Sequence, residues 1–331
     1  MSATPFVVLV VLSSEWFQRG YVEEYENIWE DLTVSGQLIV VYINHRVGML
    51  GFLDAGIEET PGNLGIHDAY LALSWIAEHI QAFRGDPNSL VGLGHGSGAY
   101  IASLDLFAPT WHRRRFFKRL ILQGLSPASL LPRAAPNFLA SVAASLQCDR
   151  HGDSASSVAC ISDLPLSQIY RGTPKEQPFL FIPSCSKLPV RDCDDMLQEL
   201  PVFLRHREIM CGFSQDDGYR LFDRFVMEPT SPVPKEPSAV FDHLQRFFTG
   251  MPPKHEFKSL SPEAQRVLNR SDLEGFRNLV VDMVLRCPLL GLVRNAVLKG
   301  TLAYMYAAEV PTVVFEPALT RADIIDFAKT G

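Results

Sequence analysis

The sequence predicts an α/β fold in which helices cover both faces of a mainly parallel sheet, followed by a helix-rich second half. The apolar runs near the start of the chain are continuous and rich in β-branched residues, as is typical of strands buried on both faces. Segments with apolar residues at helical spacing separate these runs. From residue 127 onward the pattern becomes more helical and more irregular. Together these observations favour a parallel sheet with crossover helices.

Individual elements follow from apolar periodicity and from turn residues. Gly85-Asp86-Pro87, for example, is expected to end a helix. We predict strands at 6–12, 38–44, 90–93, 120–123, 207–213 and 302–310, and helices at 68–81, 99–106, 241–249, 262–268 and 273–285; residues 23–32 are helical or irregular. Proline clusters at 132–136, 229–237 and 252–253 indicate loops. None of these is long enough to be a convincing linker, so one domain over residues 1–331 is predicted.

Composition excludes several functional classes. The 331 residues are 47% hydrophobic and 20% charged, which is typical of a globular chain. A net charge of -7 argues against nucleic-acid binding. The basic cluster Arg113-Arg114-Arg115 with Lys118 and Arg119 is predicted to be a solvated connection from a helix to a strand.

Neither a membrane anchor nor a metal site is predicted. The apolar run at 5–12 falls well short of the ~20 residues that a spanning helix needs, and it lacks the flanks of a signal peptide. It is predicted instead to be a buried strand, which suggests that an upstream part is absent. No spacing of cysteine or histidine indicates a metal, and we predict no cofactor.

The six cysteines leave the redox compartment open. Cys148 and Cys160 bracket a short polar stretch and could close a disulfide loop, which would indicate an oxidising compartment. Free thiols in a cytosolic protein are the alternative. The pairing of the other four is open: Cys185, Cys193, Cys211 and Cys287. Asn269-Arg270-Ser271 is a glycosylation sequon, a triplet that also arises by chance.

The segment 89–98 is predicted to form a sharp turn between a strand and a helix. This is the context of a nucleophile elbow, G-x-S-x-G, in which a strained turn lifts a serine hydroxyl above a sheet. Gly94 and Gly98 occupy the two flanking positions, and Gly96 occupies the middle one. Because glycine has no side chain, it cannot attack a carbonyl. The sequence therefore predicts a nucleophile-elbow turn that lacks the nucleophile.

Several further blocks resemble the type-B carboxylesterase/cholinesterase family. The stretch 44–52 is similar to N-Y-R-L-G-x-L-G-F, the stretch 61–68 to P-G-N-x-G-L-x-D, and the stretch 75–89 to W-V-x-x-N-I-x-x-F-G-G-D-P-x-S. The Cys148 and Cys160 pair and Arg286-Cys287-Pro288 also match family landmarks. The resemblance is dense over 5–126 and traceable to the end. It implies the α/β-hydrolase fold, and because family members are longer, it suggests that an N-terminal and a C-terminal portion are absent.

Polar residues within these blocks have a structural interpretation. Asn44, Arg46 and Asp68 stand beside strongly apolar runs. We therefore predict that they form a buried hydrogen-bonded cluster that braces the fold.

Ester hydrolysis on this fold needs a nucleophile, a base, an acid that orients the base, and donors for the oxyanion. The resemblance assigns the nucleophile position to Gly96, the acid to Asp217 in 214–218, and the base to Arg321 in 321–325. Arginine stays protonated near neutral pH and cannot serve as a base. The glycine-rich oxyanion loop is replaced by four residues with side chains: Ser13, Ser14, Glu15 and Trp16.

Other groups offer weak substitutes for the missing parts. Ser97 would need glycines at 95 and 99 for an elbow of its own, and those positions hold His95 and Ala99. Asp217 is better explained as an acidic helix cap, because the sequence supplies no base for it to orient. The histidines, including His67 and His95, are predicted to be structural.

The resemblance therefore indicates a catalytically inactive, neuroligin-like member of the family. It implies an extracellular or cell-surface domain in recognition or adhesion, with a cell-surface protein as partner; a homodimer is open. Two alternatives stay open: a carboxylic-ester hydrolase with Ser97 as displaced nucleophile, and a non-functional partial copy whose sheet would expose unpaired edges.

Overall fold

The computed structural model of the chain describes residues 4–20, 26–107, 115–127, 129, 138–150, 152–172, 183, 207–214, 273–308 and 327–329. Several predicted features lie outside these residues: the helices at 241–249 and 262–268, the acidic turn, Asp217, Arg321, Asn269, Cys185 and Cys193.

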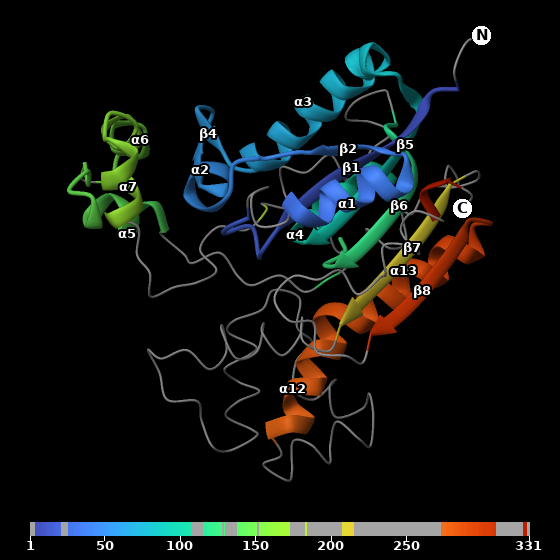
Figure 1. Cartoon of the computed structure of the whole chain (residues 1–331). Helices are drawn as coiled ribbons and strands as arrows, with labels where there is room; N and C mark the ends of the chain where they lie inside the picture. The colour runs from blue at the N-terminus through green and yellow to red at the C-terminus, as the bar shows by residue number, and fades with distance from the viewer. Residues whose placement is uncertain are drawn as a thin grey trace.

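A six-stranded parallel sheet forms the centre of the described structure (Figure 1). The strand order is β2-β1-β5-β6-β7-β8. The bounds are β1 Phe6–Ser14, β2 Ile39–Tyr42, β5 Gly85–Gly96, β6 Phe117–Gly124, β7 Glu208–Ser214 and β8 Leu302–Ala308. A separate antiparallel pair is formed by β3 (Asp54–Ile57) and β4 (Thr60–Pro61). The parallel sheet that the sequence predicts is confirmed.

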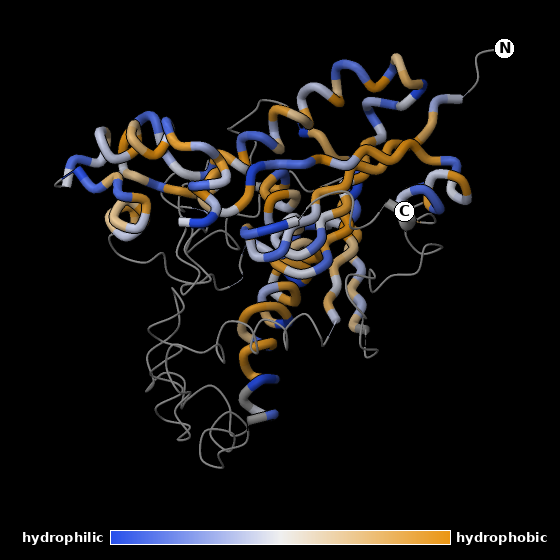
Figure 2. The backbone as a smooth tube through the Cα atoms, turned by 60° about the vertical axis from the view of Figure 1, so that its left-hand side comes forward, coloured by the Kyte–Doolittle hydropathy of each residue, from blue (hydrophilic) through white to orange (hydrophobic). Residues whose placement is uncertain are grey.

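Helices cover both faces of the sheet, because continuous apolar strands are buried on both sides. One face packs against α3 (Leu64–His79), α4 (Ser97–Phe107) and α13 (Cys287–Leu298). The other packs against α1 (Glu26–Gly36) and the short segment that holds Phe327. Figure 2 shows the hydrophobic chain concentrated in the central strands. The remaining helices are α2 Gly48–Phe52, a 3-10 turn Ile80–Phe83, α5 Phe138–Ser145, α6 Ser154–Ser162, α7 Leu166–Gly172 and α12 Leu273–Val281.

The helix predicted at 68–81 does end before Gly85, since the 3-10 turn that follows α3 finishes at Phe83. Two other boundaries differ from the prediction. The strand predicted at 90–93 begins earlier, at Gly85, which pairs with Phe6. The helix predicted to end at residue 285 continues from α12 through a π-helical turn, Asp282–Arg286, into α13. Pro288 stands at the beginning of α13, directly after the π-helical turn, and does not stop the helix.

A disulfide joins Cys148 and Cys160, whose Cα atoms are 5.6 Å apart. It connects the end of α5 to α6, in a group of three short helices (Figure 1). This group lies where the sequence predicts a more helical and more irregular region. Of the described cysteines, Cys211 is buried and unpaired, and Cys287 is exposed and unpaired. Among the described residues no helix is long and apolar enough to cross a bilayer.

The basic cluster is not uniformly solvated, which corrects the prediction for its last member. Arg119 lies within β6 and is buried, whereas Lys118 is exposed. The Arg119 Nε donates to Glu208 Oε2 at 2.8 Å, which joins β6 to β7. Successive residues of a strand point to opposite faces, so one residue of a basic run can be buried in an ion pair while its neighbour is exposed.

A second ion pair, Asp105–Arg207, is more deeply buried. Arg207 Nη1 lies 3.0 Å from Asp105 Oδ2, and both side chains are less than a tenth exposed. The Asp105 carboxylate also accepts hydrogen bonds from the backbone N–H groups of Phe116 and Phe117. These contacts attach the end of α4 to the beginnings of β6 and β7.

We expect Arg207→Met to lower the free energy of unfolding by about 3–5 kcal/mol, because it leaves the Asp105 carboxylate buried without its cation. Urea titration followed by circular dichroism measures the change. Arg46→Met is the matched control: the Arg46–Asp68 pair is half-exposed, so its loss is expected to cost about 1 kcal/mol or less. Equal losses in the two variants would contradict this account.

Candidate functional site

The predicted turn lies at the carboxyl edge of the sheet, where β5 ends at Gly96 and α4 begins at Ser97. Gly96 has φ +59°, a left-handed conformation that favours glycine. It pairs with Ser14 on β1 and with Gly124 on β6. Its carbonyl accepts a hydrogen bond from the Leu125 N–H at 3.2 Å. The geometry is that of a sharp strand-to-helix turn.

The space beside Gly96 is occupied by main chain. A Cβ atom built at this position would overlap the carbonyl oxygen of Ser14. Any side chain at residue 96 would therefore require β1 to move. Both the nucleophilic group and the room for it are absent at this turn.

Ser97 is fully buried and its hydroxyl is saturated with hydrogen bonds. Its Oγ donates to the Ser14 carbonyl at 2.8 Å and accepts from the Phe17 N–H at 2.7 Å. The Ser14 hydroxyl lies 2.8 Å from the same oxygen. Ser97 thus connects the turn to β1. Its hydroxyl uses its hydrogen-bonding capacity on protein groups and is not available to a substrate.

The four residues at the expected oxyanion loop divide between a strand and a tight turn. Ser13 and Ser14 are not in a loop: they belong to β1 and pair with His95 and Gly96. Glu15 begins a turn that closes at Arg19, where its N–H donates to the Arg19 carbonyl at 2.7 Å. The two side chains also form an ion pair. The β1 ladder thus continues two residues further than the sequence predicts, and the chain folds back on itself directly after it.

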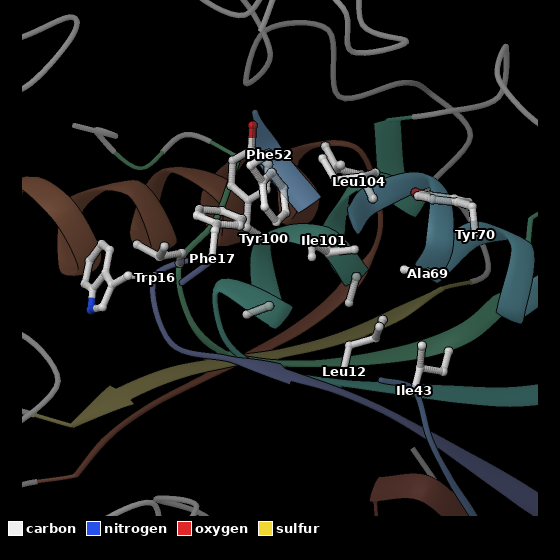
Figure 3. Close-up of a cluster of buried hydrophobic side chains, with 14 of the residues drawn as sticks. Leu12, Trp16, Phe17, Ile43, Phe52, Ala69, Tyr70, Tyr100, Ile101 and Leu104 are labelled. Carbon is white, nitrogen blue, oxygen red and sulfur yellow. The ribbon is translucent and has the colours of Figure 1, made fainter. Parts of the chain in front are cut away.

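Trp16 and Phe17 form the tip of this turn, both with positive φ (+52° and +61°). Such a conformation is unfavourable for residues with side chains, so tertiary contacts must hold it. The Phe17 ring is buried and packs edge-on against Phe52 and Tyr100, at centroid distances of 5.1 and 5.5 Å (Figure 3). Its carbonyl accepts from the Gly48 N–H at 2.6 Å. Burial of this ring anchors a turn whose N–H groups at Glu15 and Phe17 already have protein partners.

One serine hydroxyl lies near an imidazole, but it is not at the turn. Ser13 Oγ is 3.3 Å from His95 Nδ1. Ser13 is 5% exposed and is a strand residue two positions along from Val11, on the face covered by α1. The Ser13 hydroxyl is therefore on the opposite face of the sheet from α4, the helix that begins at the turn.

The predicted buried cluster of Asn44, Arg46 and Asp68 is corrected in one respect. Arg46 and Asp68 do bond, with Nε to Oδ2 at 2.7 Å and Nη2 to Oδ1 at 2.6 Å. Asn44 and Arg46 are exposed, however, because the connection that carries them runs along the rim of the sheet. The bracing interpretation therefore holds for the ion pair, but at the surface.

His45 lies beside this ion pair. Its Nδ1–H donates to the Arg46 carbonyl at 3.0 Å, which leaves the lone pair on Nε2. That nitrogen is enclosed and has no hydrogen-bond partner within the described chain. Burial lowers the pKa of His45 below its ordinary 6.5, and the Arg46 carbonyl and the Asp68 carboxylate oppose this only in part. Desolvation disfavours the Asp68 anion, but bonds from Arg46 outweigh it and lower the pKa of Asp68.

Sequence reasoning missed the residues that close this site. It did not find Phe17, whose ring anchors the turn, or Gly124, where an added Cβ would press against the main chain of Gly96. A bulky aromatic directly after the expected glycine positions is a signal that could have indicated a filled loop. Asp217 and Arg321 lie outside the described residues, so their assigned roles stay predictions.

A parallel sheet of this strand order, with its sharp turn after the third strand in space, defines an α/β-hydrolase fold. Comparison with known families agrees. The model of the carboxylesterase family matches residues 2–323, and the chain belongs to that family.

Curated relatives include proteins of different kinds. Rat bile salt-activated lipase is 30% identical over 211 residues, which is 60% of this chain and 34% of that protein. Bovine thyroglobulin is 34% identical over 56% of this chain and 7% of its own length. Human neuroligin-2 is 30% identical over 62% of this chain and 25% of its own length. The matched region is therefore about a third or less of each of these relatives.

Stability is expected to fall as the pH drops below about 6.5. The unfolded chain binds a proton at His45 more readily than the folded chain does, so the unfolded state gains in this range. Protonation of Asp68 also lowers stability, but this loss begins only below pH 3.8, the ordinary pKa of the carboxyl, because the pKa of Asp68 in the folded chain is lower than that value. Urea midpoints measured from pH 7.5 to 5 should therefore decline, and His45→Phe should flatten the decline. His79→Phe, at the exposed end of α3, is the control and should leave it unchanged. An unaltered slope in His45→Phe would refute the assignment.

Proposed function

We propose that this chain is a catalytically inactive carboxylesterase-family domain that acts in extracellular recognition or cell adhesion. The observation that carries the proposal is the occupation of the turn: the Ser14 carbonyl lies where the first side-chain atom of a nucleophile at residue 96 would stand. We treat residues 1–331 as one domain, with Gly96, Asp217 and Arg321 as degenerate triad positions and residues 13–16 as a degenerate oxyanion segment.

The size of the expected losses in kcat supports the proposal that the domain is catalytically inactive. Loss of a serine nucleophile commonly costs about 10⁶ in kcat, and loss of one oxyanion donor costs about 10²–10³. In this chain the N–H groups of Glu15 and Phe17 donate to protein oxygens, and a carboxylate at Glu15 would oppose a developing oxyanion. Either defect alone would lower the rate severely.

The recognition role is supported by a different set of observations. Neuroligin-2 and thyroglobulin are among the relatives, and the family resemblance includes non-catalytic members. The disulfide between Cys148 and Cys160 is typical of proteins in an oxidising compartment, and Asn269 is a candidate glycosylation site there. We infer a cell-surface or secreted protein as the partner.

The rival function is ester hydrolysis with Ser97 as displaced nucleophile. The three hydrogen bonds of its hydroxyl and its complete burial weigh against this. A non-functional partial copy is the other alternative. Cooperative thermal unfolding of the expressed chain would favour a stable domain, whereas a broad transition without a midpoint would favour the copy.

Restoring the missing hydroxyl is not expected to restore activity. We expect Gly96→Ser to show no turnover of p-nitrophenyl acetate above buffer, since its Cβ meets the Ser14 carbonyl. Left-handed backbone strain and displacement of β1 should lower the free energy of unfolding by about 1–3 kcal/mol. Gly96→Ala is the matched control: it carries the same Cβ without a hydroxyl, so both variants should be equally destabilised and equally inactive.

A fluorophosphonate probe separates the proposal from its rival. No labelling is expected of the unaltered chain. Labelling that Ser97→Ala abolishes would establish the rival, and labelling that Ser13→Ala abolishes would place a nucleophile beside His95. Esterase activity in Gly96→Ser that is absent from Gly96→Ala would show that the site is open rather than filled.

A further inference from the structure

A row of polar side chains crosses the sheet at its carboxyl edge, on the face covered by α1. Strand pairing aligns Ser13, His95, Gln123, Gly212 and Tyr306 in one line. The residues two positions earlier on the first three strands are the buried apolar side chains Val11, Leu93 and Ile121. The face thus changes from apolar to polar at this row.

Gln123 is the exceptional member of the row. It is 3% exposed, and neither its amide oxygen nor its amide nitrogen has a hydrogen-bond partner in the described part of the chain. A buried carboxamide that loses water and gains no partner disfavours folding. Such groups are rare in folded proteins, and each calls for a specific explanation.

Other polar side chains lie on both sides of Gln123 in the row. On one side, the Ser13 hydroxyl lies 3.3 Å from His95 Nδ1. On the other side, the phenol ring of Tyr306 covers Gly212, where a Cβ would overlap the ring. His95 and Tyr306 are both half-buried. The row thus has a half-buried side chain on each side of Gln123.

The position of the row in the topology is that of a ligand site. The chain passes from β1 to β2 on one side and later returns to β5 on the other. In open parallel sheets, ligands bind outside the carboxyl ends of the strands at such a reversal. Ser13 and His95 stand on the two strands that flank it, and Gln123 stands on the next.

We propose that Gln123 is the anchoring group of a binding site for a small neutral molecule that carries a carboxamide. An amide presents one donor and one acceptor side by side, and these pair with both unpartnered atoms of the Gln123 side chain. An anion would face the amide oxygen with like charge, and a cation would leave the amide nitrogen unpaired. This site requires no nucleophile, so it stands independently of acyl chemistry at residue 96.

Thermal unfolding of the full chain with benzamide tests the site. We expect millimolar benzamide to raise the melting temperature of the unaltered chain, and Gln123→Met to weaken apparent binding at least tenfold. Methionine has a similar length and no hydrogen-bonding amide, so this variant should be at least as stable as the unaltered chain without the probe. Gln81→Met, at an exposed glutamine, is the matched control and should keep the benzamide shift.

Three results would overturn the proposal. One is the absence of a benzamide shift in the unaltered chain, and another is an equal shift in Gln123→Met. The third is a larger shift with benzoate than with benzamide, which would identify an anion site. In the first case, a Gln123→Met variant that is also less stable than the unaltered chain would show that the amide binds ordered water only.

Discussion

The pairing of Ser14 with Gly96 is the contact on which the site depends. By extending the β1 ladder to this residue, the chain brings a main-chain carbonyl to the turn between β5 and α4. The same carbonyl accepts the Ser97 hydroxyl, and Ser97 in turn accepts the N–H of Phe17. The Ser14–Gly96 pair thus lies at the centre of a connected set of contacts that includes the Ser97 hydroxyl and the turn that holds Phe17.

The sheet was predictable because parallel strands are apolar on both faces and leave a continuous signal. The turn at Gly96 was predictable as well, because small residues at 94, 96 and 98 stand between a strand and a helix. The extension of β1 was not. Ser13 and Ser14 are polar, so hydropathy ends the strand at Leu12, whereas pairing with His95 and Gly96 continues it. The end of β1 is therefore set by backbone hydrogen bonding and not by the polarity of its side chains.

Charged residues show the same limit of sequence reasoning. Arg119 belongs to a basic run, yet it is buried beside Glu208, a residue 89 positions away in sequence. Asn44 and Arg46 stand among apolar residues, yet they are exposed at the rim of the sheet. In each case the environment depends on a partner or an edge that only the tertiary arrangement supplies. Local composition predicts burial of apolar residues well and burial of charge poorly.

The absence of a nucleophile at residue 96 and the absence of space beside that residue reinforce each other. A serine at residue 96 would keep β1 at a distance, since its Cβ could not coexist with the Ser14 carbonyl. With glycine there, the main chain of β1 can approach and complete its pairing. The contacts of Phe17 with Phe52, Tyr100 and Gly48 then stabilise a turn whose backbone is otherwise unfavourable. A hydroxyl at residue 96 could not undo these contacts by itself, because the aromatic packing and the ladder would still hold β1 in the space that catalysis needs.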